Sequence, residues 1–148
     1  MTSSSGIQFE VRPRPEVWGD LEVHCTLVWA GRKVDDVQLA DMVELAQTLG
    51  TNYGPIATRI IGEDWLGDGD THVWQVYQTT TLTWMRDLVV KWIAGGRRVW
   101  KPHITAPRQG FQAIGRDPVV HFDAVTVWHK DERMMYPFVA KKRTSEHP

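Results

Sequence analysis

Two short segments of this chain each place a histidine and a threonine two residues apart. The first is Glu22-Val23-His24-Cys25-Thr26-Leu27-Val28-Trp29, and the second is Trp100-Lys101-Pro102-His103-Ile104-Thr105-Ala106-Pro107. Side chains alternate between the two faces of a strand, so each apolar run would present its His and Thr on one side. Two imidazoles and two hydroxyls, with no metal cage expected around them, indicate general acid–base chemistry on an anionic substrate.

The residues around the motifs strengthen this interpretation. In the first segment, His24 and Thr26 are expected to share a face with Val28. The opposite face would carry Val23, Cys25, Leu27 and Trp29. In the second segment, the residues expected to oppose the His and Thr are Pro102, Ile104 and Ala106. A single pair of this kind is more often a half-buried structural histidine, but two pairs in matching contexts favour a functional site.

Length and charge indicate one domain and a small ligand. The chain has 148 residues, enough for one sizeable core and short for two domains. Its net charge of −1 argues against tight binding to long duplex nucleic acid. A small anionic ligand in a local pocket is compatible with this charge. No feature of the sequence points to a particular oligomeric state.

The sequence predicts a cytoplasmic protein with no membrane partner. A single cysteine, Cys25, cannot form an intramolecular disulfide, and its apolar surroundings suggest a reduced, inert thiol. The first residues lack the basic and apolar regions of a signal peptide, and no run is long enough to span a bilayer.

The pattern along the chain alternates strands with helices. Strands are expected at 7–11, 21–29, 56–66, 72–78, from 99 onward, at 118–129 and at 134–139. Helices are expected at 34–49, with Asp35 as N-cap and Gly50 beyond the end, and at 83–94. Residues 67–70 are expected to form a hairpin turn, and two tails, 1–6 and 141–148, are expected to be disordered.

This order predicts an α+β fold of two similar lobes. Each half contains one His-Thr strand, so the antiparallel sheets of the two lobes would face each other across a central cleft, with the helices outside. Each lobe would place its own His-Thr pair in that cleft.

With these motifs and this order of elements, the sequence resembles the two-histidine (2H) phosphoesterase superfamily, which includes 2′-5′ RNA ligase-like proteins and cyclic phosphodiesterases. The signature of that family is two copies of His-x-Thr/Ser, usually followed by an apolar residue. Here they are His24-Cys25-Thr26-Leu27 and His103-Ile104-Thr105-Ala106. The resemblance extends over roughly 7–139, including an inter-motif strand pair and a closing strand at 122–128.

The resemblance implies a metal-independent enzyme without a cofactor. One imidazole would accept a proton while the other donates one, and the near-symmetry of the motifs leaves both assignments open. Thr26 and Thr105 would donate hydrogen bonds to phosphate oxygens. Arg108 stands where many ligase-like members carry an Arg, although Ala106-Pro107 departs from the larger apolar residues usual there.

Further substrate contacts are expected from aromatic residues. Most of the 8 Trp are expected in the core. Trp18 and Tyr53 lie in expected loops, which makes them candidates for stacking on a base.

Within the family, the compact length and the His-Cys-Thr motif are most similar to phage nucleases that cleave the cyclic di- and trinucleotide signals of bacterial antiphage defence (anti-CBASS nucleases). The expected partner is then a small cyclic oligonucleotide, cut to a 2′,3′-cyclic phosphate in the host cytoplasm. Three alternatives stay open. They are a 2′-5′ ligase-like or 2′,3′-cyclic phosphodiesterase acting on RNA ends, a non-catalytic nucleotide-binding module, and a purely structural protein.

Overall fold

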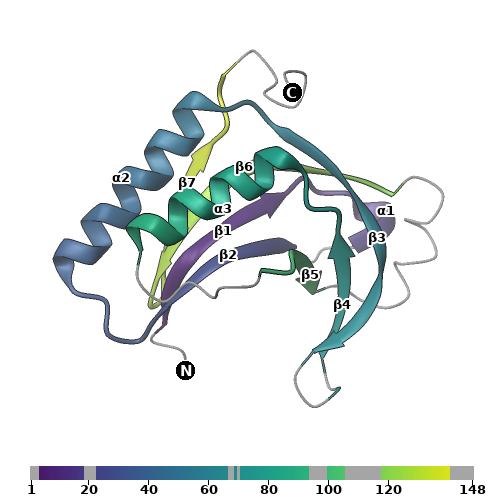
Figure 1. Ribbon diagram of the computed structural model, residues 1–148, viewed down its shortest axis with the longest axis horizontal. Helices are drawn as coiled ribbons and strands as arrows, with labels where there is room; N and C mark the ends of the chain where they lie inside the picture. Colours follow the sequence, from purple (N-terminus) through teal and green to yellow (C-terminus); the bar gives the residue numbers. More distant parts are fainter. Residues whose placement is uncertain are drawn as a thin grey trace.

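A computed structural model describes residues 4–18, 23–66, 69, 71–93, 100–105 and 118–140. The described part contains seven strands and three helices in the following order: β1 (Ser5–Val11), α1 (Pro15–Trp18), β2 (His24–Gly31), α2 (Asp36–Asn52), β3 (Ile56–Leu66), β4 (Thr71–Val76), α3 (Thr80–Trp92), β5 (His103–Thr105), β6 (Val119–His129) and β7 (Glu132–Pro137). The two long helices lie on the same side of the strands (Figure 1).

The strands form one antiparallel sheet in the order β1-β2-β5-β4-β3-β6-β7. β6 also pairs with β1, so the pairings link six of the strands in a closed ring, and β7 extends the sheet beyond β6. The predicted α+β class and antiparallel strands are confirmed. The two motif strands, however, are neighbours in one continuous sheet, and they do not belong to separate sheets that face each other. Their pairing brings the two halves of the chain together at the motifs.

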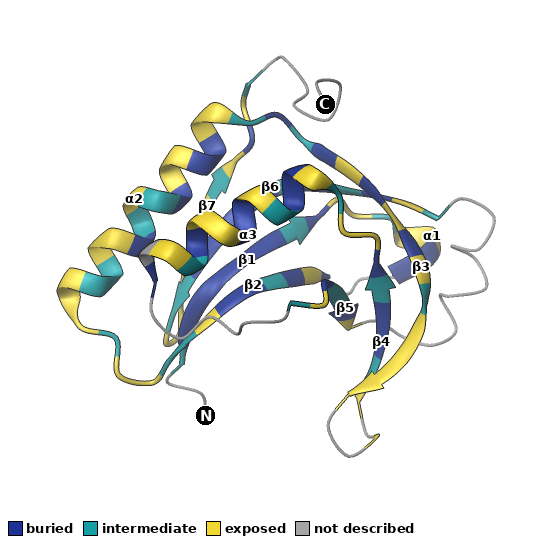
Figure 2. Ribbon diagram, in the orientation of Figure 1, coloured by how far each residue is buried: buried dark blue, intermediate teal, exposed yellow. Residues whose placement is uncertain are grey.

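One face of the sheet packs against α2 and α3 and forms the core. Strand residues of this face include Phe9, Cys25, Ile104 and Phe122, all fully buried. The helices contribute the apolar residues of their inner stripes, which are Met42, Ala46, Leu49, Leu82, Met85 and Val89. Figure 2 shows this burial as dark segments on the inner sides of α2 and α3. We call the opposite face of the sheet the motif face.

Each of the two long helices begins directly after an N-cap residue whose side chain accepts a backbone hydrogen bond. Asp35 caps α2 in a capping box, accepting from the backbone N–H of Gln38 at 2.8 Å while the Gln38 side chain accepts from the backbone N–H of Asp35. Thr79 caps α3 in a similar way, accepting from Leu82 N–H at 3.2 Å. The predicted N-cap of α2 is confirmed, and α3 begins three residues earlier than expected because Thr79 supplies the capping oxygen.

The predicted end of α2 is wrong. The helix continues through Gly50 to Asn52, and Gly50 is buried against β7. A Cβ at this glycine would lie only 2.9 Å from the Pro137 carbonyl oxygen. The lack of a side chain at Gly50 therefore lets the backbones of α2 and β7 approach closely. The N-terminal tail also ends earlier than expected, since Ser5 and Gly6 are buried residues of β1.

A β-bulge in β2 changes the expected alternation of faces. Gln8 pairs with Thr26, but its neighbour Ile7 pairs with Val28, so Leu27 is an extra residue. Leu27 and Val28 are both buried as a result. The expectation that Val28 shares a face with His24 is therefore wrong, and Trp29 is turned out of the core instead of into it.

Candidate active site

The register between β2 and β5 places both motifs on the same side of the sheet. Cys25 lies directly opposite Ile104 in this antiparallel pair. In such a ladder, the flanking residues pair as His24 with Thr105 and Thr26 with His103, and directly opposed side chains share a face. Since Cys25 and Ile104 point into the core, all four motif side chains lie on the motif face.

Burial agrees with this placement. His24 and Thr105 are exposed, and Thr26 and His103 are half-buried. The middle residues of the two motifs, Cys25 and Ile104, are fully buried. The set is compact because Cβ atoms of directly opposed residues lie about 4.5 to 5.5 Å apart. One phosphate group can thus be reached from both motifs.

A hydrogen bond determines which nitrogen of His103 is available. Its Nδ1 donates to the Lys101 carbonyl oxygen at 2.8 Å. A carbonyl oxygen only accepts, so Nδ1 carries a proton, and Nε2 is the nitrogen that can take up or release one. This bond also fixes the orientation of the ring, as a positioned acid or base requires.

Cys25 is a structural residue of the site. Burial raises the pKa of its thiol to about 12, and an interaction with the His103 backbone opposes this rise in part. The thiol is therefore protonated at neutral pH and takes no part as a nucleophile. It connects the strand of one motif with the backbone of the other.

Trp100, which precedes the second motif, forms a hydrogen bond to the first motif. Its indole Nε1–H donates to the Thr26 carbonyl oxygen at 3.2 Å, across the two motif strands. On α3, the guanidinium of Arg86 lies 5.7 Å from the centre of the Trp100 ring. Burial lowers the pKa of Arg86. This contact joins the helix layer to the segment that carries His103.

Polar residues on neighbouring strands extend the motif face. On β1, Gln8 lies opposite Thr26 and Glu10 opposite His24, and the Gln8 amide donates to the Glu10 carboxylate at 2.7 Å. On the other side, Gln75 of β4 lies opposite His103. The site therefore has an amide and a carboxylate on its β1 flank and an amide on its β4 flank.

Two tryptophans lie further along the same face. Trp29 of β2 and Trp128 of β6 both pair with Gly6 of β1, one on each side. A Cβ at this glycine would lie 2.2 Å from the Trp128 ring, so the absence of a side chain makes room for that ring. Trp29 is 55% exposed. Trp29 and Thr26 lie opposite Gly6 and Gln8, which are two residues apart on β1, so at about 3.3 Å per residue their Cα atoms are roughly 7 Å apart.

Of the other expected binding residues, Trp18 and Tyr53 are described, and neither belongs to the motif face. Trp18 belongs to α1 and is only 3% exposed, with its ring packed on Trp74 at 4.8 Å, so the expectation of an exposed loop residue is wrong. Tyr53 caps the C-terminal end of α2 and is half-buried. Arg108 lies outside the described residues.

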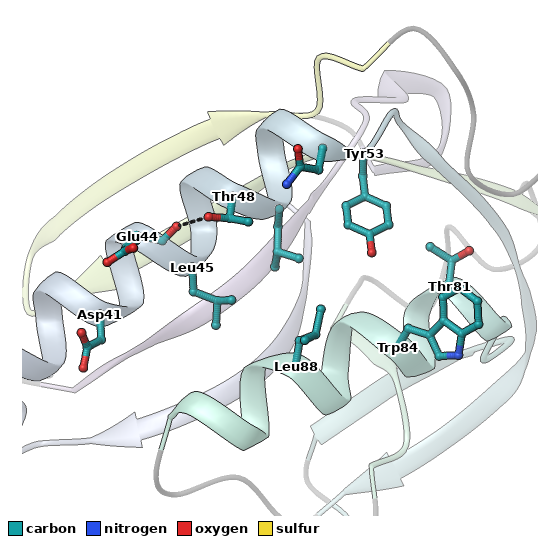
Figure 3. Close-up of a pocket in the computed structure, with 10 residues that line it drawn as sticks. Asp41, Glu44, Leu45, Thr48, Tyr53, Thr81, Trp84 and Leu88 are labelled. Carbon is teal, nitrogen blue, oxygen red and sulfur yellow. Dashed lines mark hydrogen bonds between the residues drawn. The ribbon is translucent and has the colours of Figure 1, made fainter.

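Tyr53 lines a groove between α2 and α3, on the helical side of the sheet. This groove has a volume of about 650 Å³ and is bordered by Leu45, Trp84 and Leu88, with Asp41 and Glu44 at its edge (Figure 3). It is separated from the motif face by the sheet and core, and it contains neither motif.

Several residues of the motif face were not singled out from the sequence. Gln8 and Glu10 alternate with Ile7, Phe9 and Val11, a period of two that marks one polar face of a strand. That signal was present. The exposure of Trp29 had no such signal, because it depends on the bulge at Leu27.

The described residues contain neither a metal site nor a membrane-spanning helix. No group of three or more His, Cys, Asp or Glu side chains there is arranged to hold a metal ion. No helix in the same ranges is both long and apolar enough to cross a membrane.

Solved structures of other proteins share this architecture. Usb1 from Kluyveromyces marxianus matches with a TM-score of 0.66 at 9% identity, covering 91% of this chain and 98% of that one. TT0787 of Thermus thermophilus matches with a TM-score of 0.59 at 15% identity, covering 90% and 97%. E. coli LigT, solved in complex with 3′-AMP, matches with a TM-score of 0.54 at 14% identity, covering 90% and 95%.

These neighbours are two-histidine phosphoesterases. The chain has the 2H phosphoesterase fold. No family model and no curated protein sequence matches it, so the likeness is one of fold. The three matches cover 90% to 91% of this chain.

Proposed function

We propose that this protein is a metal-independent phosphodiesterase that cleaves small cyclic oligonucleotides. The observation that carries the proposal is the pairing of Cys25 with Ile104, which puts two imidazoles and two hydroxyls on one face. The 2H fold supports the same reaction class. Acid–base catalysis by two histidines needs no metal ion, because each ring can hold or release a proton near neutral pH.

The proposed reaction uses the ribose 2′-hydroxyl as nucleophile. One imidazole accepts the 2′-OH proton while O2′ forms a bond to phosphorus. The bond from phosphorus to O5′ breaks, and the imidazolium of the other motif donates its proton to O5′. The products are a 2′,3′-cyclic phosphate and a free 5′-hydroxyl. Each proton transfer is worth about 10²–10⁴-fold in rate.

Thr26 and Thr105 stabilise the negative charge on the non-bridging oxygens. Each hydroxyl lies beside the histidine of the opposite motif, so the four groups surround one phosphate from two sides. Hydrogen bonds aimed at charge that grows in the transition state lower the barrier more than they tighten ground-state binding.

Trp29 and Trp128 would supply the base-binding surface. A base stacks on an aromatic ring with little dependence on its identity, at about 1–3 kcal/mol per base. Trp29 is exposed on the same face as the motifs, at a distance that one nucleoside can bridge. We infer that the substrates are cyclic di- or trinucleotides of the kind used as antiphage signals, degraded in the cytoplasm.

The test is a substrate panel assayed with EDTA present. Purified protein is incubated with cyclic di- and trinucleotides, 2′-5′-linked dinucleotides and 2′,3′-cyclic mononucleotides, and products are identified by mass. Cleavage of the cyclic oligonucleotides in chelator, to 2′,3′-cyclic phosphate ends, supports the proposal. Activity that requires an added metal ion would overturn it.

A second candidate is a phosphodiesterase acting on RNA ends. It is favoured by the match to LigT, a protein solved in complex with 3′-AMP. The same four motif residues would serve both reactions, so the panel decides. Preferential hydrolysis of 2′,3′-cyclic mononucleotides or of 2′-5′ linkages would select this second function.

A further inference from the structure

A tyrosine extends the motif face on its β4 side. On β4, Gln75 lies directly opposite His103, and the next residue, Val76, is buried in the core. Tyr77 follows, and its backbone N–H donates to the Arg59 carbonyl oxygen at 2.9 Å, which continues the pairing of β4 with β3. Because strand side chains alternate, Tyr77 returns to the face of Gln75 and His103. Its side chain is 47% exposed there.

Arg59 of β3 contacts this tyrosine from the neighbouring strand. Thr58 and Ile60 are buried, whereas Arg59 between them is exposed and so points away from the core. The guanidinium carbon of Arg59 lies 4.9 Å from the centre of the Tyr77 ring, a cation–π contact. The Thr58 hydroxyl donates to the Tyr77 carbonyl oxygen at 2.7 Å. Two strands with a fixed backbone therefore present a cation and an aromatic ring together.

The positive charge of Arg59 is available to a ligand. A guanidinium that stacks on a ring uses its flat face, so its N–H edge stays free to bind oxygen atoms. No ion pair or hydrogen bond joins these N–H groups to another described residue. Two carboxylates of the adjacent strands are already engaged, since Asp64 accepts from the Gln75 amide at 3.0 Å and Asp123 pairs with Arg12 at 2.9 Å.

The Arg59–Tyr77 pair lies within reach of a substrate held by the motifs. Tyr77 is two residues beyond Gln75, about 7 Å along β4, and Gln75 is directly opposite His103. On the other side of β5, Trp29 lies one step beyond Thr26 in the same direction, because β2 and β4 both run antiparallel to β5. Substrate groups that continue past the cleaved phosphate at this end therefore extend toward both aromatic rings.

We propose that Arg59 binds a second phosphodiester of the substrate, the one that is not cleaved, and that Tyr77 is the positioning residue that holds its guanidinium. This inference rests on the proposed function for the phosphate held by the motifs. A guanidinium and a phosphate form paired, charge-assisted hydrogen bonds. A cyclic di- or trinucleotide carries a second phosphodiester, whereas a 2′,3′-cyclic mononucleotide does not. Arg59 therefore selects cyclic oligonucleotides over single nucleotides.

The experiment measures binding in an inactive His24→Ala background with two probes, cyclic di-AMP and 2′,3′-cyclic AMP. Arg59→Gln is expected to raise the Kd for cyclic di-AMP about tenfold or more and to leave the Kd for 2′,3′-cyclic AMP nearly unchanged. Arg59→Lys keeps the charge but loses the planar fork, so its loss should be intermediate. Lys91→Gln, which removes one positive charge from an exposed position on α3, is the matched control and should affect neither probe.

A double-mutant cycle tests the positioning role of Tyr77. Tyr77→Leu alone should raise the Kd for cyclic di-AMP about 2- to 5-fold, the size of an exposed cation–π contact. In the Arg59→Gln background the same change should add little, because Tyr77 acts through the guanidinium. Tyr77→Phe keeps the ring and should keep the binding. Equal effects of Tyr77→Leu in both backgrounds would refute the positioning role.

The two probes separate this inference from the proposed function. Equal losses for both probes in a folded Arg59→Gln protein would overturn the second site, as would an unchanged Kd for cyclic di-AMP. Wild-type protein that binds cyclic di-AMP without cleaving any cyclic oligonucleotide would instead refute the proposed function. The titrations would then still decide whether Arg59 holds a second phosphodiester.

Discussion

Cys25 of β2 lies directly opposite Ile104 of β5, and both side chains are fully buried. This pair is the register point between two segments that are far apart in sequence. A shift of one residue would turn the His and Thr of one motif into the core, since alternate residues of a strand face opposite sides. The proposed chemistry therefore depends on packing below the site as much as on the residues within it.

Removal of either imidazole should abolish most of the activity. His24→Ala and His103→Ala are each expected to lower kcat by about 10²–10⁴-fold, because each removes one proton transfer. Both positions lie outside the core, so thermal stability should change little. His129→Gln is the matched control, since this histidine bonds Ser5 and lies far along β6. Equal activity of the motif variants and the control would refute the assignment.

Loss of a threonine hydroxyl should affect turnover more than binding. Thr26→Val and Thr105→Val keep the side-chain shape and remove a donor to the charged oxygens, so kcat should fall by about 10²–10³-fold with a small change in KM. The measurement is steady-state kinetics on a cleaved cyclic oligonucleotide. Thr71→Val, at an exposed position in β4, controls for the substitution itself. A rise in KM with unchanged kcat would show that the hydroxyls only bind the ground state.

Trp29→Ala should lower kcat/KM for nucleotide substrates. Loss of one stacked base at about 1–3 kcal/mol predicts a fall in kcat/KM of about 5- to 150-fold. Trp84→Ala is a matched control, because Trp84 is 56% exposed but lies on α3 at the groove between the helices. Titration of an inactive His103→Ala protein with a cyclic dinucleotide measures the binding directly. Similar losses in both tryptophan variants would argue against a base-stacking role for Trp29.

The sequence predicted the motifs, the α+β class and most element positions, because these depend on local pattern. The alternation around Cys25 and Ile104 is enough to mark both as core residues. The pairing itself, and the placement of both motifs in one sheet, depend on contacts between distant segments. The bulge at Leu27 had no local signature such as glycine, so the exposure of Trp29 was missed. Trp18 was misjudged because tertiary packing on Trp74 buries a residue of a very short helix.

Burial of the Cys25 thiol should make the folded protein less stable as the pH rises into the alkaline range. An unfolded cysteine has a pKa of about 8.5, and burial raises the pKa of Cys25 to about 12 in the folded protein. Between these values the unfolded chain holds fewer protons than the folded one, so stability falls as pH rises. At pH 9.5 the loss from this group should be about 1.4 kcal/mol. Urea unfolding at pH 7.5 and 9.5 measures it, and Cys25→Ala should remove this part of the decline. A decline of the same size in that variant would assign it to other groups.

A methyl group at Gly6 should destabilise the sheet beside the motifs. An alanine Cβ there would lie 2.2 Å from the Trp128 ring and 2.4 Å from the Val28 carbonyl oxygen. The ring can rotate away, but the carbonyl belongs to the paired strand β2, so the two strands must separate locally. Overpacking of this kind costs about 1–3 kcal/mol.

Gly62→Ala is the comparison for this variant. Its Cβ would meet only the Gln75 side chain, at an ordinary 3.6 Å, so stability should stay within about 0.5 kcal/mol of the wild type. Urea unfolding compares the two proteins. Displacement of Trp128 in Gly6→Ala should also raise the Kd for a cyclic dinucleotide, whereas Gly62→Ala should leave it nearly unchanged. Equal stability of the two variants would mean that β1 and β2 are less tightly paired at Gly6 than these contacts require.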